Sequence, residues 1–169
     1  HQLLSEFRDY RGHCAHMTIG AVLAIPDADR IQQSQYQTYA SVDLTAPQFS
    51  EVLASLNNGQ QSGIFSLQLH GKEHFWPAKL MDEMQRSDEL KQWLEQDCVY
   101  TEKLPSTLQS RWNPPLSIQE IAVAVKHEVD LFKRCFGVPP EIAVPPTFVW
   151  NEEVEISWRS HGIHTIVTP

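Results

Sequence analysis

Short apolar runs alternate along this chain with segments of helical periodicity, and this alternation is the feature that most limits its fold. Runs at residues 17–25, 64–70, 141–144 and 164–167 have the length and composition of strands. The segments between them predict helices, so the order is strand, helix, strand, helices, strand, helix, strand. That order is typical of an α/β fold in which parallel strands alternate with helices.

The predicted helices are marked by the residues at their ends. Ser117-Ile118-Gln119-Glu120 is a capping-box sequence that predicts the start of the longest helix, and Gly137 predicts its end. Thr45 can cap an earlier helix that ends at residues 57–59. The remaining helices are expected at 78–86, at 88–96, and from Asn151 to near Gly162.

Right-handed crossovers would make the strands parallel and place their carboxyl ends along one rim of the sheet. The residues expected on that rim are Asp27, His70, Pro145–Thr147 and Thr168–Pro169. Function in parallel α/β folds gathers at such a rim. A closed barrel needs about 200 to 250 residues. We therefore expect residues 1–169 to form a single domain that is an incomplete segment of a distorted (β/α) barrel.

Composition and charge limit the partners of the protein. With 169 residues, 41% of them hydrophobic, the chain can bury a substantial core. Its net charge of −8 and pI of about 5.4 disfavour nucleic acid and anionic membrane surfaces as partners. No apolar run reaches the roughly 18 to 20 residues that span a bilayer. The sequence does not indicate an oligomeric state.

The cysteines bear on the cellular location. Cys14, Cys98 and Cys135 form no C-x-x-C pattern, and their odd number argues against a full disulfide framework. They predict buried thiols in a reducing compartment and, with no visible signal peptide, a cytoplasmic protein. Because the first residue is His1 and not Met, a secreted or periplasmic protein whose leader has been removed is the alternative.

Two histidines at the end of the second strand are the strongest functional signal. His70 closes the apolar run, Gly71 lets the backbone turn sharply, and His74 follows within the same short segment. Neutral imidazole is a common ligand of zinc and related ions, so the pair predicts half of a divalent-metal site. The alternative is that His70 is an ordinary strand-end histidine and that His74 is a surface residue beside Trp76.

Other side chains near the same rim are candidates for chemistry or binding. Asp27 could bind a metal or act as a catalytic base, and its alternative role is turn formation within residues 26–29. The flat rings of Trp76 and Trp150, with those of Phe75 and Phe148, would suit stacking on sugar faces. Packing in the core or in a lid explains these aromatic residues about as well.

Several other patterns carry less functional weight. His13 and His16 precede their strand and would lie at the opposite rim. We interpret His127, in the middle of a predicted helix, as structural, together with His161 and His164. The sequence has no G-x-S-x-G, no phosphate-binding glycine-rich loop and no zinc-finger signature, which disfavours serine hydrolases, nucleotide-binding proteins and zinc fingers.

Three ordered features resemble the polysaccharide deacetylase family, also called carbohydrate esterase family four. The segment from His70 to His74 is similar to the family motif of His, Ser or Thr, two variable positions, and His. Val144-Pro145-Pro146-Thr147 is similar to the Arg-Pro-Pro-Tyr sequence at a strand end in the family. The helix predicted from Asn151 and the strand within residues 162–167 are similar to the next helix and strand of the family. The resemblance covers residues 17–169.

The resemblance implies a distorted (β/α) barrel with a divalent metal, usually zinc, held by an aspartate and two histidines. His70 and His74 would be the two histidine ligands. We expect the substrate-binding residues to be Trp76, Pro145, Pro146, Thr147 and Trp150.

The chain also departs from the family pattern. The paired aspartates of the family do not occur, and they would belong before His1 if residues 17–25 are the second barrel strand. Gly71 replaces Ser or Thr, Val144 replaces Arg, and Thr147 replaces the aromatic residue. The catalytic histidine of the family would lie beyond Pro169. Such a chain is either a segment of an active enzyme or a divergent member whose activity is altered or lost.

The resemblance implies a metal-dependent hydrolase that removes acetyl groups from an N-acetylated carbohydrate, and so acts on C–N bonds other than peptide bonds. One alternative is a metal-free carbohydrate-binding or structural barrel domain. Another is a related barrel hydrolase that acts on small cyclic amides or on glycosidic bonds, the latter requiring two rim carboxylates about 5 to 10 Å apart.

Overall fold

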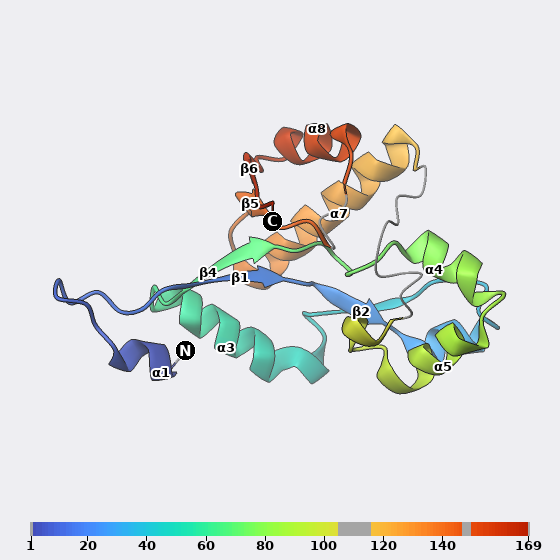
Figure 1. The fold of residues 1–169 in the computed structure, drawn as a ribbon, viewed down its shortest axis with the longest axis horizontal. Helices are drawn as coiled ribbons and strands as arrows, with labels where there is room; N and C mark the ends of the chain where they lie inside the picture. The colour runs from blue at the N-terminus through green and yellow to red at the C-terminus, as the bar shows by residue number, and fades with distance from the viewer. Residues whose placement is uncertain (1, 105–115, 147–149, 169) are drawn as a thin grey trace.

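The computed structural model describes residues 2–104, 116–146 and 150–168 (Figure 1). The helices, in chain order, are α1 (Gln2–Glu6), α2 (Ala28–Gln33), η1 (Pro47–Phe49), α3 (Ser50–Gln61), α4 (Pro77–Met84), α5 (Asp88–Asp97), η2 (Thr101–Lys103), α7 (Ile118–Phe136) and α8 (Glu152–Ser160). The strands are β1 (Met17–Ala21), β2 (Ala24–Pro26), β3 (Ser41–Asp43), β4 (Phe65–Leu69), β5 (Ile142–Ala143) and β6 (Thr165–Ile166).

Four strands form a parallel sheet in the order β1-β4-β5-β6. β1 and β4 are paired from Met17 opposite Phe65 to Ala21 opposite Leu69, and Leu69 in turn lies opposite Ala143 of β5. The predicted α/β class, with parallel strands alternating with helices, is confirmed. Within the described residues the sheet is open, so its place in a closed barrel stays a prediction.

Helices cover the sheet from two sides. In Figure 1, α3 lies on one side of β1 and β4, and α7 and α8 lie on the other. The main core fills the space between these layers, with Leu67 and Leu69 of β4 and Phe132 of α7 at most 4% exposed. Ile121, Val125 and Val129 of α7 pack into the same core. Burial is greatest at the carboxyl-terminal half of the central strand β4, whereas most of the edge strand β1 is exposed.

The predicted first strand, residues 17–25, is wrong in one respect, because it is two strands in different sheets. The backbone N–H groups of Leu23 and Ala24 both donate to the carbonyl of Lys72, at 3.0 and 2.8 Å. The chain thereby leaves the parallel sheet after β1, and β2 pairs antiparallel with β3. This antiparallel pair, with α2, α4 and α5, surrounds a second core that includes Ile31, Leu80 and Trp93.

The helix ends confirm the strongest capping predictions. The N–H of Glu120 donates to the Ser117 hydroxyl at 3.3 Å, and the Glu120 carboxylate accepts from the Ser117 N–H at 2.8 Å, so both halves of the capping box form. Gly137 ends α7 in the left-handed conformation, with φ of 75°. Asn151 caps α8 by accepting from the N–H of Val154 at 3.0 Å.

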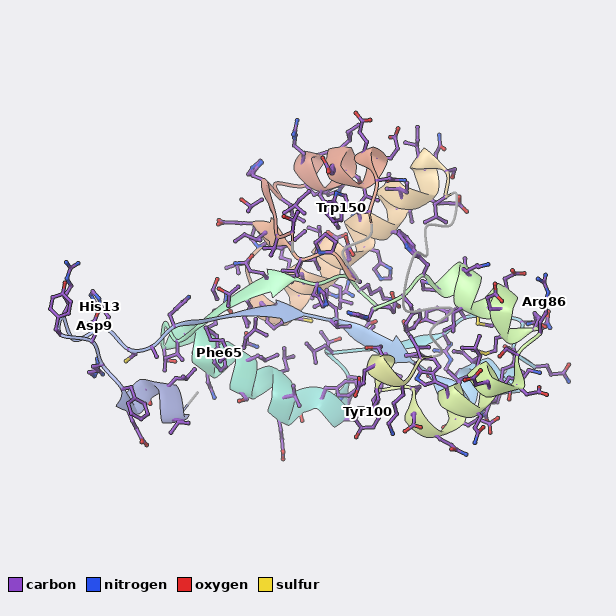
Figure 2. The ribbon with its side chains drawn as sticks, in the orientation of Figure 1. Asp9, His13, Phe65, Arg86, Tyr100 and Trp150 are labelled. Atoms are coloured by element: carbon purple, nitrogen blue, oxygen red, sulfur yellow. The ribbon has the colours of Figure 1, made fainter. Side chains whose placement is uncertain are left out.

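The helix expected to begin at Thr45 and to end at residues 57–59 is shifted. Its first turn is η1, for which Ala46 is the cap residue, and α3 continues to Gln61. Gly59 therefore lies inside the helix, where a Cβ would be 2.1 Å from the Phe65 ring. Figure 2 shows Phe65 between β4 and α3. Glycine is needed here because the helix and the strand approach closely.

No helix in the described part of the chain is both long and apolar enough to span a bilayer.

Candidate metal centre and adjoining pocket

The turn after β4 positions the two histidines. Gly71 has φ of 83°, and a Cβ on it would lie 2.9 Å from both the Glu73 carbonyl oxygen and Cγ of Pro146. A residue with a side chain would be strained by the backbone angle and would collide with the neighbouring strand end. Gly71 therefore allows the chain to reverse tightly between His70 and His74.

His70 is anchored to the neighbouring strand end. Its Nδ1 lies 2.5 Å from the carbonyl oxygen of Val144, and its backbone N–H donates to the Ala21 carbonyl at 3.0 Å. Because a carbonyl can only accept, this contact places a proton on Nδ1, so that in the neutral tautomer Nε2 is the electron-pair donor. A ring oriented in this way is typical of histidine ligands of metals.

His74 lies next to His70 and is held in its neutral form. The ring centroids are 4.9 Å apart, with the planes inclined at 59°. Burial lowers the pKa of His74, and the neighbouring His70 lowers it further, against an opposing backbone hydrogen bond. The neutral imidazole is the form that binds a metal ion. The two rings therefore have the separation and the chemistry expected of two ligands of one ion.

The described residues supply only this pair. They contain no group of three or more His, Cys, Asp or Glu side chains that could hold a metal ion. Asp27, the sequence candidate for a carboxylate at the rim, follows β2 and caps α2, where its side chain accepts from the N–H of Arg30 at 3.1 Å. The histidines thus fit half of a metal site, and the catalytic role of Asp27 stays a prediction.

A pocket of about 250 Å³ adjoins the histidine pair. His74 and Trp76 line it from the segment after β4, Pro146 from the segment after β5, and Trp150 from just before α8. Figure 2 shows Trp150 on the side of the sheet that α7 and α8 cover. Three of the expected substrate-binding residues, Trp76, Pro146 and Trp150, therefore share one cavity. Pro145 is fully buried beside it, and Thr147 lies outside the described residues.

A buried ion pair forms within the histidine turn, residues 70–74. Lys72 Nζ lies 3.0 Å from Glu73 Oε1 and donates to the Ser41 hydroxyl at 2.8 Å. The Tyr39 hydroxyl donates to the same Glu73 oxygen at 3.1 Å. Burial raises the pKa of Glu73, while Lys72 and Tyr39 act to lower it. Burial and the nearby Glu73 raise the pKa of Tyr39. This network connects the histidine turn to β3 and to Tyr39, which precedes it.

Glu128 of α7 is a pocket residue that the sequence reasoning missed. The indole N–H of Trp158 donates to its Oε1 at 2.7 Å, and the backbone N–H of Lys72 donates to the same carboxylate. Burial raises the pKa of Glu128 to about 7. His127, interpreted from the sequence as structural, also lines the pocket.

A sequence signal for Glu128 did exist. It lies three residues after Val125 and four before Phe132, which places a carboxylate on the apolar stripe of an amphipathic helix. An acid at such a position is expected to be at least partly buried and to need a polar partner. The partner is Trp158, which is distant along the chain.

Two solved structures are similar to this chain. One is IcaB from Ammonifex degensii, with 11% sequence identity and a TM-score of 0.44, over 68% of this chain and 38% of IcaB. The other is BC0361, a polysaccharide deacetylase from Bacillus cereus, with 12% identity and a TM-score of 0.48, over 97% of this chain and 34% of BC0361. The chain thus spans about a third of the length of each.

BC0361 is a polysaccharide deacetylase, and this is the family that the sequence motifs resemble. Likeness at this level of identity and TM-score does not establish a common function. The sequence matches no protein-family model and no curated protein.

Proposed function

We propose that the protein is a metal-dependent hydrolase that removes acetyl groups from an N-acetylated carbohydrate, with His70 and His74 as two ligands of a divalent ion, zinc being the leading candidate. The observation that carries the proposal is the anchored His70 ring, 4.9 Å from the neutral His74 ring at the edge of an aromatic-lined pocket. The motif resemblance supports the same reaction class.

The side chains have distinct parts in this proposal. A bound divalent ion would supply Lewis-acid activation of the acetamide carbonyl and a water molecule of lowered pKa. The Val144 carbonyl holds His70 with Nε2 available, and partial burial keeps His74 neutral. Trp76 and Trp150 offer flat apolar surfaces to a sugar ring. The remaining ligand and the catalytic base are not identified among these residues, and Asp27 stays a candidate for the base.

We further infer that the chain is one domain and a segment of a (β/α) barrel. Its open, parallel sheet, with helices on both faces, supports this inference. In that case the missing acidic ligand would come from another part of the barrel.

Acetate release from N-acetylglucosamine oligomers by the full-length protein tests the proposal. We expect release that depends on added zinc and that is lost in His70→Ala and in His74→Ala. His164→Ala is the matched control, because this histidine is exposed and lies outside the pocket lining. Release that chelation does not affect, or that both histidine variants retain, would contradict the proposed metal ligands.

A metal-free carbohydrate-binding domain is the second candidate. It is favoured by the three tryptophans, Trp76, Trp150 and Trp158, that line one cavity. It predicts oligosaccharide binding that survives both histidine substitutions, without release of acetate.

A further inference from the structure

We propose that the pocket beside the histidine pair binds the protonated amino group of an amino sugar, with the Glu128 carboxylate as its anionic partner. The identity of the sugar rests on the proposed function, whereas the charge of the recognised group follows from the pocket itself. The protein would thus recognise two groups: the acetamide that the reaction consumes and a free ammonium group.

The two carboxylates of the pocket differ in their partners. Glu73 forms an ion pair with the Lys72 ammonium at 3.0 Å and accepts a hydrogen bond from the Tyr39 hydroxyl. Glu128 accepts hydrogen bonds from two uncharged donors, the Trp158 indole N–H at 2.7 Å and the backbone N–H of Lys72. Within the described residues, Lys72 thus compensates the charge of Glu73, while the contacts of Glu128 only orient its carboxylate.

The surroundings of Glu128 increase its preference for a cation. A carboxylate that is partly removed from water interacts more strongly with an opposite charge than one at an exposed surface. The indole rings of Trp158, Trp150 and Trp76 line the same cavity, and the faces of such rings attract cations as well. A ligand that brings an ammonium group next to a flat, C–H-rich body would use both features.

The size of the cavity points to a small ligand. Its volume of about 250 Å³ lies just below the range of roughly 300 to 1,000 Å³ typical of sites for drug-sized molecules. A single pyranose ring with one amino substituent is of the appropriate class. Its ring face can pack on an indole while its ammonium group meets Glu128.

This ligand also fits the proposed reaction. Hydrolysis of an acetamide breaks the C–N bond, with the water hydroxyl added to the acyl carbon and a proton added to the nitrogen. At neutral pH the resulting acetic acid and amine are present as acetate and ammonium. A site for ammonium next to the reacting position would hold the product or a sugar unit that has already been deacetylated, and so would favour partly deacetylated chains.

Calorimetric titration of the full chain in EDTA, with tetramers of glucosamine and of N-acetylglucosamine, tests this proposal. We expect the glucosamine tetramer to bind at least about tenfold more tightly, as a charge-assisted contact implies. Glu128→Gln should remove that preference while leaving the affinity for the acetylated tetramer within about twofold. Asp130→Asn, an equal change of charge on the exposed face of α7, should behave as the wild type.

Three results would overturn the proposal: equal affinity of the wild type for the two tetramers, no binding of either, or a preference that persists in Glu128→Gln. The comparison within the wild type does not depend on any variant folding correctly. Because EDTA removes metal, the titration is also independent of the histidine ligands. Failure of acetate release with a preserved amine preference would reject the hydrolase proposal alone, and the opposite pattern would reject this inference alone.

Discussion

Replacement of Glu128 by Gln should stabilise the protein at high pH and have little effect at low pH. In the folded state the Glu128 carboxyl has a pKa of about 7, compared with an ordinary value of 4.5. The folded state therefore binds this proton more tightly than the unfolded state does. The stability that this proton contributes is fully present below pH 4.5 and is lost as pH rises to about 7.

The size of the effect follows from the same shift. A difference of about 2.5 pH units corresponds to about 3 kcal/mol in the free energy of unfolding. Because Glu128 is partly exposed, solvent screening makes about 3 kcal/mol an upper bound, and about 1 to 3 kcal/mol is expected. Glutamine keeps the shape of the neutral acid without its ionisation, so the variant should lack this pH dependence.

Urea unfolding of the full chain at pH values from 4.5 to 8 measures the difference directly. The stability of Glu128→Gln relative to wild type should rise by about 1 to 3 kcal/mol across this range. Glu73, whose pKa is also raised, interacts electrostatically with Glu128, so the measured difference includes the coupling between the two carboxyls. Asp130→Asn serves as the control for charge. A difference that stays constant with pH would refute the assignment of a partly buried, proton-binding carboxyl to Glu128.

Two substitutions test the structural supports of the site. Gly71→Ala should destabilise the protein by about 1 to 3 kcal/mol, because alanine is strained at a φ of 83° and its Cβ would lie 2.9 Å from Pro146. Gly63→Ala, at a φ of 70° but with no atom within 4 Å of the added Cβ, should have the smaller effect in urea unfolding. Ser117→Ala should lower stability by about 1 kcal/mol through loss of the α7 capping box, and an unchanged thermal midpoint would contradict that role.

Local sequence patterns were sufficient to predict the central strand β4 and the long helix α7. The apolar run before His70 predicted β4, and the capping box and Gly137 predicted both ends of α7. Each of these signals depends on residues within one turn or one strand. Parallel order followed from the alternation of strands and helices, which allows few other topologies.

Long-range contacts account for what the sequence did not predict. The separation of β1 from β2 depends on the Lys72 carbonyl, which accepts from Leu23 and Ala24 far along the chain. Gly59 lies inside α3 in close contact with the Phe65 ring of β4, a contact that no local pattern predicts. The two proposed ligands could be predicted from their spacing, whereas Tyr39, which donates to Glu73, and Trp158, which donates to Glu128, are distant along the chain.

Metal content of the purified full-length protein, measured after EDTA treatment, reloading with zinc and removal of excess ion, is the most direct test of the central proposal. We predict one bound ion per molecule, lost in His70→Ala and in His74→Ala and retained in His164→Ala. A full-length protein that retains no zinc, or histidine variants that retain as much as the wild type, would contradict the metal centre at the end of β4.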